Sequence, residues 1–202
     1  GPTSFAQTNT AAQSALELCL GRGGDQVVVK ADGKAVFYGG KTKEMEKYSR
    51  VRARVISHAL AGLIEESDVV VAMGHQFLDM DALGASLGIV SAAKALGKPS
   101  FAVLTPGQNP SVDSLLEFLI KDDDVKGVFL NEQETLDKMT KKSLLVVVDT
   151  HRPSFSLSAK VLEKAEKVVV IDHHRRGEEF IDKALLVYLE PYASSTGEMV
   201  TE

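Results

Sequence analysis

The strongest constraint on the fold is a series of short apolar runs that contain no alternating polar residues. They are rich in Val, Ile and Leu, and they occupy residues 69–73, 101–104, 127–130, 144–148, 167–171 and 185–189. Strands covered on both faces have this composition. Segments with helical periodicity lie between several of the runs, at about residues 81–96, 111–121, 131–139 and 155–165. Strands and helices that alternate in this way predict a doubly wound α/β domain with a mostly parallel sheet.

The first 45 residues follow a different pattern. A helical segment, TAAQSALELCL, precedes two alternating segments that flank Asp32-Gly33, which is a strong signal for a β-hairpin. Residues 46–65 are charged at first and then helical in period, so we interpret them as a connecting helix. The predicted organisation is a helix-plus-hairpin in residues 1–45, a connecting helix in 46–65 and the α/β domain in 66–202.

Composition excludes several classes of protein. The formal net charge is −5, and the chain has no basic stripe, which argues against binding of double-stranded nucleic acid. Cys19 is the single cysteine, so an intrachain disulfide is impossible and a reducing compartment is expected. No apolar run approaches the roughly 20 residues that span a bilayer. We interpret Gly1-Pro2 as the remnant of a cleaved tag and expect a cytoplasmic domain.

Acidic residues, histidines and arginines follow three of the predicted strands. In an open parallel sheet, ligands bind beyond the carboxyl ends of the strands. The residues in these positions are His75, Asp79 and Asp81 after the first strand, Asp149 to Arg152 after the fourth, and Asp172, His173, His174, Arg175 and Arg176 after the fifth. We therefore expect one polar site at this edge of the sheet.

These residue types favour a metal site. Aspartates that lie close together repel one another unless a cation neutralises them. A mixture of histidine and carboxylate suits Mn²⁺, Fe²⁺, Co²⁺ or Zn²⁺ better than Ca²⁺, and the lack of thiolates argues against structural zinc. The number of ligands makes two metals plausible, and a pair of ions is the usual arrangement for displacement at phosphorus. The arginines and a remaining histidine would then meet phosphate oxygens.

Each of these residues also has a simpler interpretation. Asp81 could be a helix N-cap, and Asp149 could cap a turn. The pair His173-His174 could be a surface feature, and Asp172 could serve only to orient a neighbouring histidine. The joint placement of the residues at three strand ends is what favours a site.

The segment that follows residue 189 has two interpretations. Ser195 and Glu198 fit a capping box at the start of a helix. Because that helix would begin near the strand ends, its amides, with Ser194 and Ser195, could also contact phosphate. The structural interpretation is preferred, and the contact with substrate is a second hypothesis.

At these residues the sequence resembles the DHH phosphoesterase family. The segment VVVIDHHRR carries the Asp-His-His motif that names the family, and GHQFLDMDALG and VVVDTHRP match its first two motifs in order and spacing. The resemblance covers about residues 66–202. It implies a site for two Mn²⁺ ions.

The resemblance also implies a role for each residue. His75 and Asp79 would hold one metal, and Asp81 and His173 would hold the other. Asp149 would bridge the two ions and be essential for catalysis. His174 would contact substrate phosphate, where Arg175 and Arg176 are expected from the chemistry of arginine.

The N-terminal segment ALELCLGRGGDQVVVK resembles the end of a GGDEF domain. We interpret Gly23-Gly24-Asp25 as a helix stop and not as a cyclase motif, because no Glu-Phe follows. A degenerate GGDEF tail before a DHH domain is similar to the GdpP-type cyclic-di-AMP phosphodiesterases. These are bacterial membrane-anchored proteins that also carry PAS and DHHA1 domains.

This resemblance implies hydrolysis of cyclic di-AMP to linear pApA by a two-metal mechanism. The substrate would be a small nucleotide, a homodimer is possible, and contact with the cell membrane would come only through absent N-terminal segments. We expect the chain to be a fragment, because the family's last metal-binding aspartate and its DHHA1 domain would lie beyond Glu202.

Two alternatives remain. The chain could be a DHH enzyme of the nano-RNase or pAp phosphatase type, or a pyrophosphatase, although such proteins lack a GGDEF tail. It could also be a non-catalytic fragment that binds nucleotide. Rates on cyclic di-AMP, pApA and pyrophosphate would separate these possibilities.

Overall fold

The structure is a computed structural model that describes residues 4–20, 26–31, 34–39, 42–107, 109–123 and 125–202. It divides into two compact units, Gly1–Val51 and Arg52–Glu202. The boundary falls within helix α2, Thr42–Glu65. Among the described residues, no helix is both long enough and apolar enough to cross a bilayer.

The first unit contains the predicted helix and hairpin. Helix α1 spans Phe5–Leu20, and strands β1 (Gln26–Ala31) and β2 (Lys34–Gly39) pair antiparallel. The predicted Asp32-Gly33 turn and the segment Gly23-Gly24-Asp25 lie outside the described residues. The origin of this unit in a GGDEF domain stays a prediction.

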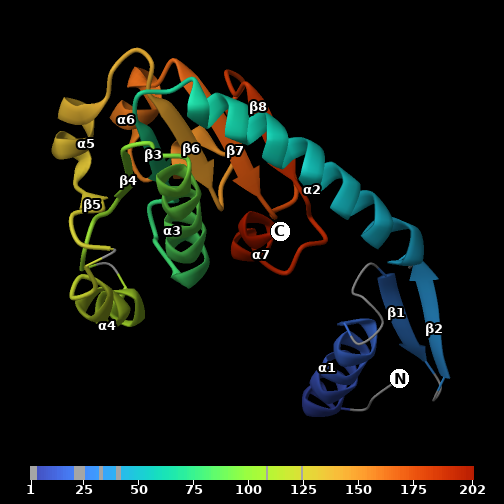
Figure 1. The fold of residues 1–202 in the computed structure, drawn as a ribbon. Coiled ribbons are helices and arrows are strands. Elements are labelled where there is room, and N and C mark those ends of the chain that lie inside the picture. Colours follow the sequence, from blue (N-terminus) through green and yellow to red (C-terminus); the bar gives the residue numbers. More distant parts are fainter. Residues whose placement is uncertain (1–3, 21–25, 32–33, 40–41, 108, 124) are drawn as a thin grey trace. The chain divides into compact units, whose positions relative to one another are not determined.

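The second unit contains a six-stranded sheet in the order β5-β4-β3-β6-β7-β8, in which every neighbouring pair is parallel (Figure 1). The strands are β3 (Val70–Met73), β4 (Ser100–Val103), β5 (Phe129–Leu130), β6 (Leu144–Val148), β7 (Lys167–Asp172) and β8 (Leu186–Leu189). The helices that connect or follow them are α3 (Met80–Ala95), α4 (Pro110–Leu119), α5 (Glu132–Lys138), α6 (Ala159–Lys164) and α7 (Thr196–Thr201). The predicted doubly wound α/β fold is confirmed.

The strand order creates a switch point between β3 and β6. The chain builds outward from β3 through β4 to β5, and then returns to the other side of β3 to build β6, β7 and β8. Connections on either side of such a point diverge, which leaves a crevice at the carboxyl ends of the two central strands. The residues that follow β3 and β6 therefore meet at this crevice.

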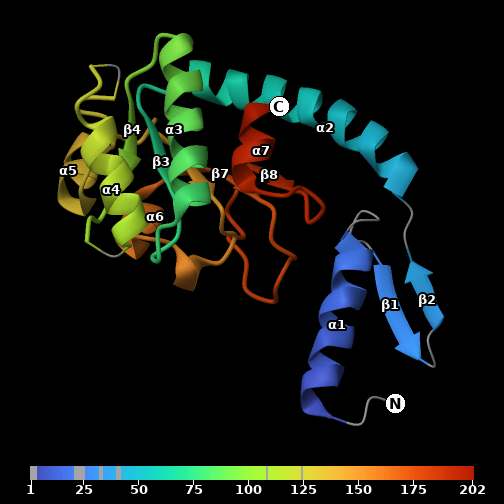
Figure 2. The same ribbon diagram turned by 90° about the horizontal axis from the view of Figure 1, so that it is seen from below.

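Helices cover both faces of the sheet, which explains the absence of polar alternation in the strands (Figures 1 and 2). One face packs against α2, α3 and α7, and the other against α5 and α6. Neighbouring residues of β6 divide between the two faces, since Val146 belongs to the first cluster and Val147 to the second. Both side chains are fully buried.

One predicted helix is shorter than the sequence suggested. The helix expected over residues 155–165 is a 3₁₀ turn at Pro153–Phe155 followed by α6, which starts at Ala159. Ser158 sets this start, because its hydroxyl accepts a hydrogen bond from the Val161 amide. Ser156 follows the 3₁₀ turn in an extended conformation and forms an isolated antiparallel bridge with His75, in the loop after β3.

Candidate metal centre

The loop after β3 is held against the segment that follows β6. The Gln76 amide donates to the Phe155 carbonyl, and the Leu157 amide donates to the Gly74 carbonyl. Gly74 permits close approach of α3, because a Cβ at this position would lie 2.9 Å from the Cβ of Ala82. These contacts fix the backbone on both sides of His75.

Asp149 directly follows β6 in an unusual backbone conformation. Its φ of 60° lies in the left-handed region, and among the described non-glycine residues it is the one with a positive φ. Asp tolerates this region better than most residues, but strain of this kind persists only where the surroundings enforce it, and it concentrates at functional sites. The Asp149 side chain is 2% exposed. The strained backbone therefore holds a carboxylate within the crevice.

One group of possible metal ligands lies on the β3 side of Asp149. His75 Nε2 is 3.4 Å from Asp149 Oδ2 and 3.7 Å from Asp79 Oδ2. The His75 side chain is 8% exposed, and its ring stacks against Phe155 with ring centroids 5.4 Å apart. These three residues form a set that could hold one ion.

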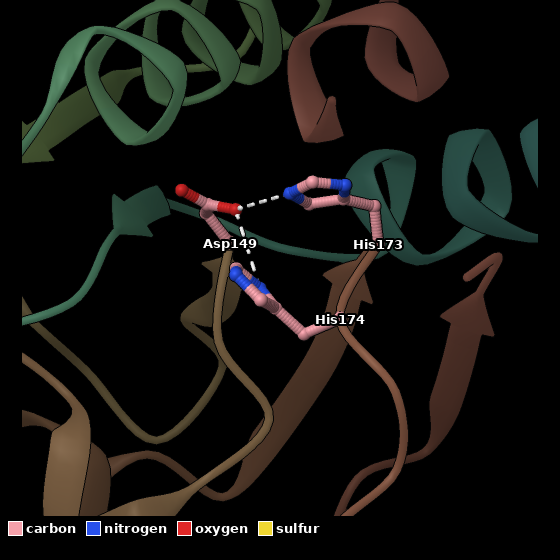
Figure 3. A group of neighbouring side chains, drawn as sticks. All are labelled: Asp149, His173 and His174. Atoms are coloured by element: carbon pink, nitrogen blue, oxygen red, sulfur yellow. Dashed lines mark ion pairs between the residues drawn. The ribbon is translucent and has the colours of Figure 1, made fainter. Parts of the chain in front are cut away.

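The second group lies on the β7 side (Figure 3). His173 Nε2 is 3.6 Å from Asp149 Oδ1, and His174 Nδ1 is 3.7 Å from the same oxygen. Asp149, His173 and His174 form a second possible metal-binding set, and Asp81 Oδ2 lies 3.7 Å from His173 Nε2. The two oxygens of Asp149 therefore face different groups, as a bridging carboxylate requires.

The geometry of these residues fits a cation. Two ligands bound at about 2.1 Å to one ion lie about 3.0–3.4 Å apart. The separations of 3.4–3.7 Å are close to this spacing, and they are long for hydrogen bonds. His75 Nδ1 is the one buried side-chain nitrogen or oxygen in the described part of the chain that has no hydrogen-bond partner. A proton on Nδ1 would leave the Nε2 lone pair directed at the two carboxylates.

The charges around His75 change its protonation. Burial lowers the pKa of His75, but the contact with Asp149 and the charge of Asp79 outweigh burial, so the pKa lies above the usual 6.5. A protonated ring cannot bind a metal ion through the same nitrogen. A cation and a proton therefore compete for Nε2.

Asp79 and Asp81 are both anchored by helix N-termini. Asp79, and not Asp81, is the N-cap of α3, because its Oδ1 accepts from the amides of Asp81 and Ala82. The interpretation of Asp81 as the cap is wrong, since the chain turns into the helix at Met80. Asp79 Oδ2 remains directed toward His75.

The carboxylate of Asp81 meets the start of α7. Its Oδ2 accepts from the Thr196 amide at 2.8 Å, and its Oδ1 accepts from the Gly197 amide at 2.6 Å. Asp81 thus approaches His173 while two amides neutralise part of its charge. The structure brings all five predicted metal ligands to one place, although their roles stay predictions.

Asp172 organises the histidines from beneath the site. It is fully buried, and its Oδ2 accepts from His151 Nδ1 at 2.5 Å. Its Oδ1 accepts from the amide and from Nδ1 of His174, at 3.1 and 2.8 Å. The His151 ring in turn accepts from the Gly177 amide at its Nε2. His151, which the sequence left without a role, ties the loop after β7 to the sheet.

A cavity of about 570 Å³ opens beside these residues. Its walls include His174, Arg175, Arg152 and Phe155. Arg176 is not among the lining residues, because its guanidinium lies over the ring of Phe180, 4.3 Å from the centroid. Of the two arginines predicted to contact substrate, Arg175 lines the cavity, and the contact itself stays a prediction.

Ser194 and Ser195 take part in the expected cap. Ser195 Oγ accepts from the Glu198 amide, and both the amide and the hydroxyl of Ser194 donate to Glu198 Oε2. These hydrogen bonds lower the pKa of Glu198. Contact of the two serines with substrate stays a prediction. The residue that reaches the candidate site is Thr196, which the sequence analysis did not single out as a site residue.

The chain is similar to two curated cyclic-di-AMP phosphodiesterases. It is 52% identical to GdpP of Geobacillus thermodenitrificans, over 100% of this chain and 31% of that protein. It is also 52% identical to PdeA of Listeria monocytogenes, over 95% of this chain and 29% of that protein. The chain therefore spans less than a third of the length of these relatives.

A solved structure and a family model agree with the fold. An exopolyphosphatase-related protein from Bacteroides fragilis aligns over 72% of this chain and 41% of its own, with a TM-score of 0.55 and 22% identity. This identity supports a shared fold alone. The model described as "DHH family, N-terminal domain" matches residues 69–202, which include the whole six-stranded sheet. The chain belongs to the DHH family.

Proposed function

We propose that this chain carries the metal-binding half of a phosphodiesterase that cleaves cyclic di-AMP to linear pApA. One observation carries the proposal: Asp149 presents its two buried oxygens to two separate groups of histidines and carboxylates at the switch point of the sheet. Paired metal ions are the usual catalysts of displacement at phosphorus. The two relatives named as cyclic-di-AMP phosphodiesterases support the choice of substrate.

The residues that would hold the metals come from the two groups, with Asp81 in place of His174 in the second. His75, Asp79 and Asp149 would hold one ion, and Asp149, His173 and Asp81 would hold the other. Divalent ions bound there would neutralise phosphoryl charge and acidify water near neutral pH. The mixture of imidazole and carboxylate suits Mn²⁺, which we propose as the metal.

In this proposal His174 acts on the substrate and not on the metal. Its side chain lines the cavity and is 57% exposed, and its Nδ1 lies 2.8 Å from Asp172 Oδ1. A carboxylate accepts hydrogen bonds, so Nδ1 must carry a proton, and Nε2 remains available. When protonated, Nε2 can donate to a phosphoryl oxygen and stabilise the charge that develops there.

The cavity supplies the remaining contacts. Arg152 and Arg175 both line it, and an arginine can bind two phosphate oxygens at once. Arg152 Nε also lies 3.5 Å from Glu179 Oε2. The Glu179 carboxylate accepts hydrogen bonds from the amide and the hydroxyl of Ser154. These contacts join the loops on the two sides of the cavity. The predicted Mn²⁺ identity, homodimer and membrane attachment of the longer protein belong to the same proposal.

The first test is incubation of the chain with cyclic di-AMP and Mn²⁺, with products separated by chromatography. We expect linear pApA, and none with Asp149→Asn or without added metal. Parallel reactions with pApA and pyrophosphate separate this activity from the nano-RNase and pyrophosphatase alternatives. Nucleotide binding without any Mn²⁺-dependent product would show that this chain is a binding module.

A further inference from the structure

Thr196 contacts two of the candidate metal ligands at once. Its hydroxyl donates to Asp149 Oδ1 at 3.0 Å, and its amide donates to Asp81 Oδ2 at 2.8 Å. The side chain is completely buried. Asp149 follows β6 and Asp81 lies on α3, so Thr196 joins ligands from two different elements.

We propose that Thr196 is a positioning residue, which fixes the rotation of the Asp149 carboxylate so that it can bridge two cations. The hydroxyl bond is the one hydrogen bond that the Asp149 carboxylate accepts among the described residues. The other polar contacts of the carboxylate are with three histidines, at 3.4–3.7 Å. With the hydroxyl bond in place, Oδ1 stays on the His173 side and Oδ2 on the His75 side.

The surrounding structure holds Thr196 in place. Ser195 caps α7, and Met199 and Val200 pack that helix into the core that includes α3. The next residue, Gly197, allows its amide to reach Asp81, because a Cβ there would lie 3.1 Å from Asp81 Oδ1. The position of the hydroxyl is therefore set by the packing of α7, and not by a flexible loop.

Residues that orient metal ligands commonly change metal affinity by 10–100-fold when they are replaced. Valine has nearly the shape of threonine but no hydroxyl, so Thr196→Val removes the bond to Asp149 and keeps the amide bond to Asp81. Thr196→Ser keeps both bonds. We expect about tenfold weaker Mn²⁺ binding for the valine variant and less than threefold for the serine variant.

Thr135 provides a matched control. It is also completely buried, and its hydroxyl donates to the carbonyl of Asn131, the N-cap of α5, at 2.7 Å and not to a candidate ligand. Thr135→Val therefore measures what loss of a buried threonine hydroxyl does to stability alone. Its Mn²⁺ dissociation constant should equal that of the wild type.

The experiment is a calorimetric titration of Mn²⁺ into the metal-free chain and the three variants, with the melting temperature of each. The proposal rests on the proposed metal site, which the wild-type titration tests by itself. Absence of wild-type binding overturns both. Wild-type binding with unchanged affinity in Thr196→Val overturns only the role of Thr196. If the valine variant does not fold, Thr196→Ala replaces it, and equal affinities of the alanine and serine variants contradict the proposal.

Discussion

Asp149 and Asp172 end neighbouring parallel strands, and both carboxylates are buried, yet their partners differ. The register that pairs Val148 with Ile171 places the two aspartates side by side. Asp172 accepts three hydrogen bonds of 2.5–3.1 Å from His151 and His174. Asp149 accepts one, from Thr196, and faces three histidines at 3.4–3.7 Å.

The difference in hydrogen bonding gives the two buried aspartates different roles. A buried carboxylate is expensive unless hydrogen bonds or opposite charges compensate it. The charge of Asp172 is compensated by hydrogen bonds from the chain itself, so this carboxylate orients histidines. Asp149 is compensated incompletely, so it is the carboxylate that would gain most from a cation.

The replacement Asp149→Asn should have the largest effect on activity. Asparagine keeps the shape and tolerates the left-handed backbone, but it removes the charge between the two groups of ligands. Metal ions contribute several kcal/mol to phosphoryl transfer, so we expect a rate loss of at least about 10³-fold. Mn²⁺ binding in calorimetry should fall in parallel, while the melting temperature of the metal-free chain should change little. A variant that still binds two ions tightly would refute the bridging role.

The variant His174→Gln tests whether a histidine held by Asp172 acts on substrate. Loss of one donor to a developing oxyanion lowers the turnover number by roughly 10²-fold or more. Because His174 Nδ1 donates a hydrogen bond to Asp172, it is not free to bind a metal ion, and Mn²⁺ affinity should change less than threefold. Turnover and affinity are measured on the same preparation. If affinity falls as far as turnover does, His174 is a metal ligand.

The variant Asp172→Asn should lower stability more than Asp149→Asn does, and activity less. An amide cannot accept from both histidines as a carboxylate does, and hydrogen bonds to charged groups contribute about 2 kcal/mol. We expect a loss of stability of about this size in denaturant unfolding, and about tenfold weaker Mn²⁺ binding through misplaced histidines. If Asp172→Asn lowers stability less than Asp149→Asn does, Asp172 is not the better compensated of the two carboxylates.

Acid should weaken metal binding through His75. The folded pKa of His75 is raised, so protonation of the metal-free ring stabilises the fold fully below pH 6.5, and this contribution is lost as pH rises through the folded pKa. Metal binding has the opposite sign, because it requires the neutral ring. Below the folded pKa, Mn²⁺ affinity should fall by about tenfold per pH unit.

An NMR titration of the metal-free chain checks this shift directly. Asp149→Asn should lower the His75 pKa, since it removes the charge 3.4 Å away. An unchanged pKa would show that Asp149 does not interact with His75 in solution.

The sequence by itself determined the fold and the edge of the sheet at which the candidate metal ligands gather. Uninterrupted apolar strands require a sheet covered on both faces, and parallel strands bring the residues after β3, β6 and β7 to one edge. His75, Asp149 and His173 could therefore be placed together without coordinates. The Asp-His-His motif and its two companion motifs placed the chain in its family.

Only the tertiary structure decided which atoms meet. Whether Asp79 or Asp81 caps α3 depends on where the backbone turns, and a shift of the helix start by two residues would make Asp81 the cap. The bonds of His151 to Asp172 and of Thr196 to Asp149 and Asp81 join residues 21, 47 and 115 positions apart. No local pattern encodes such contacts, because they arise from the packing of α7 on α3 and from the order of the strands.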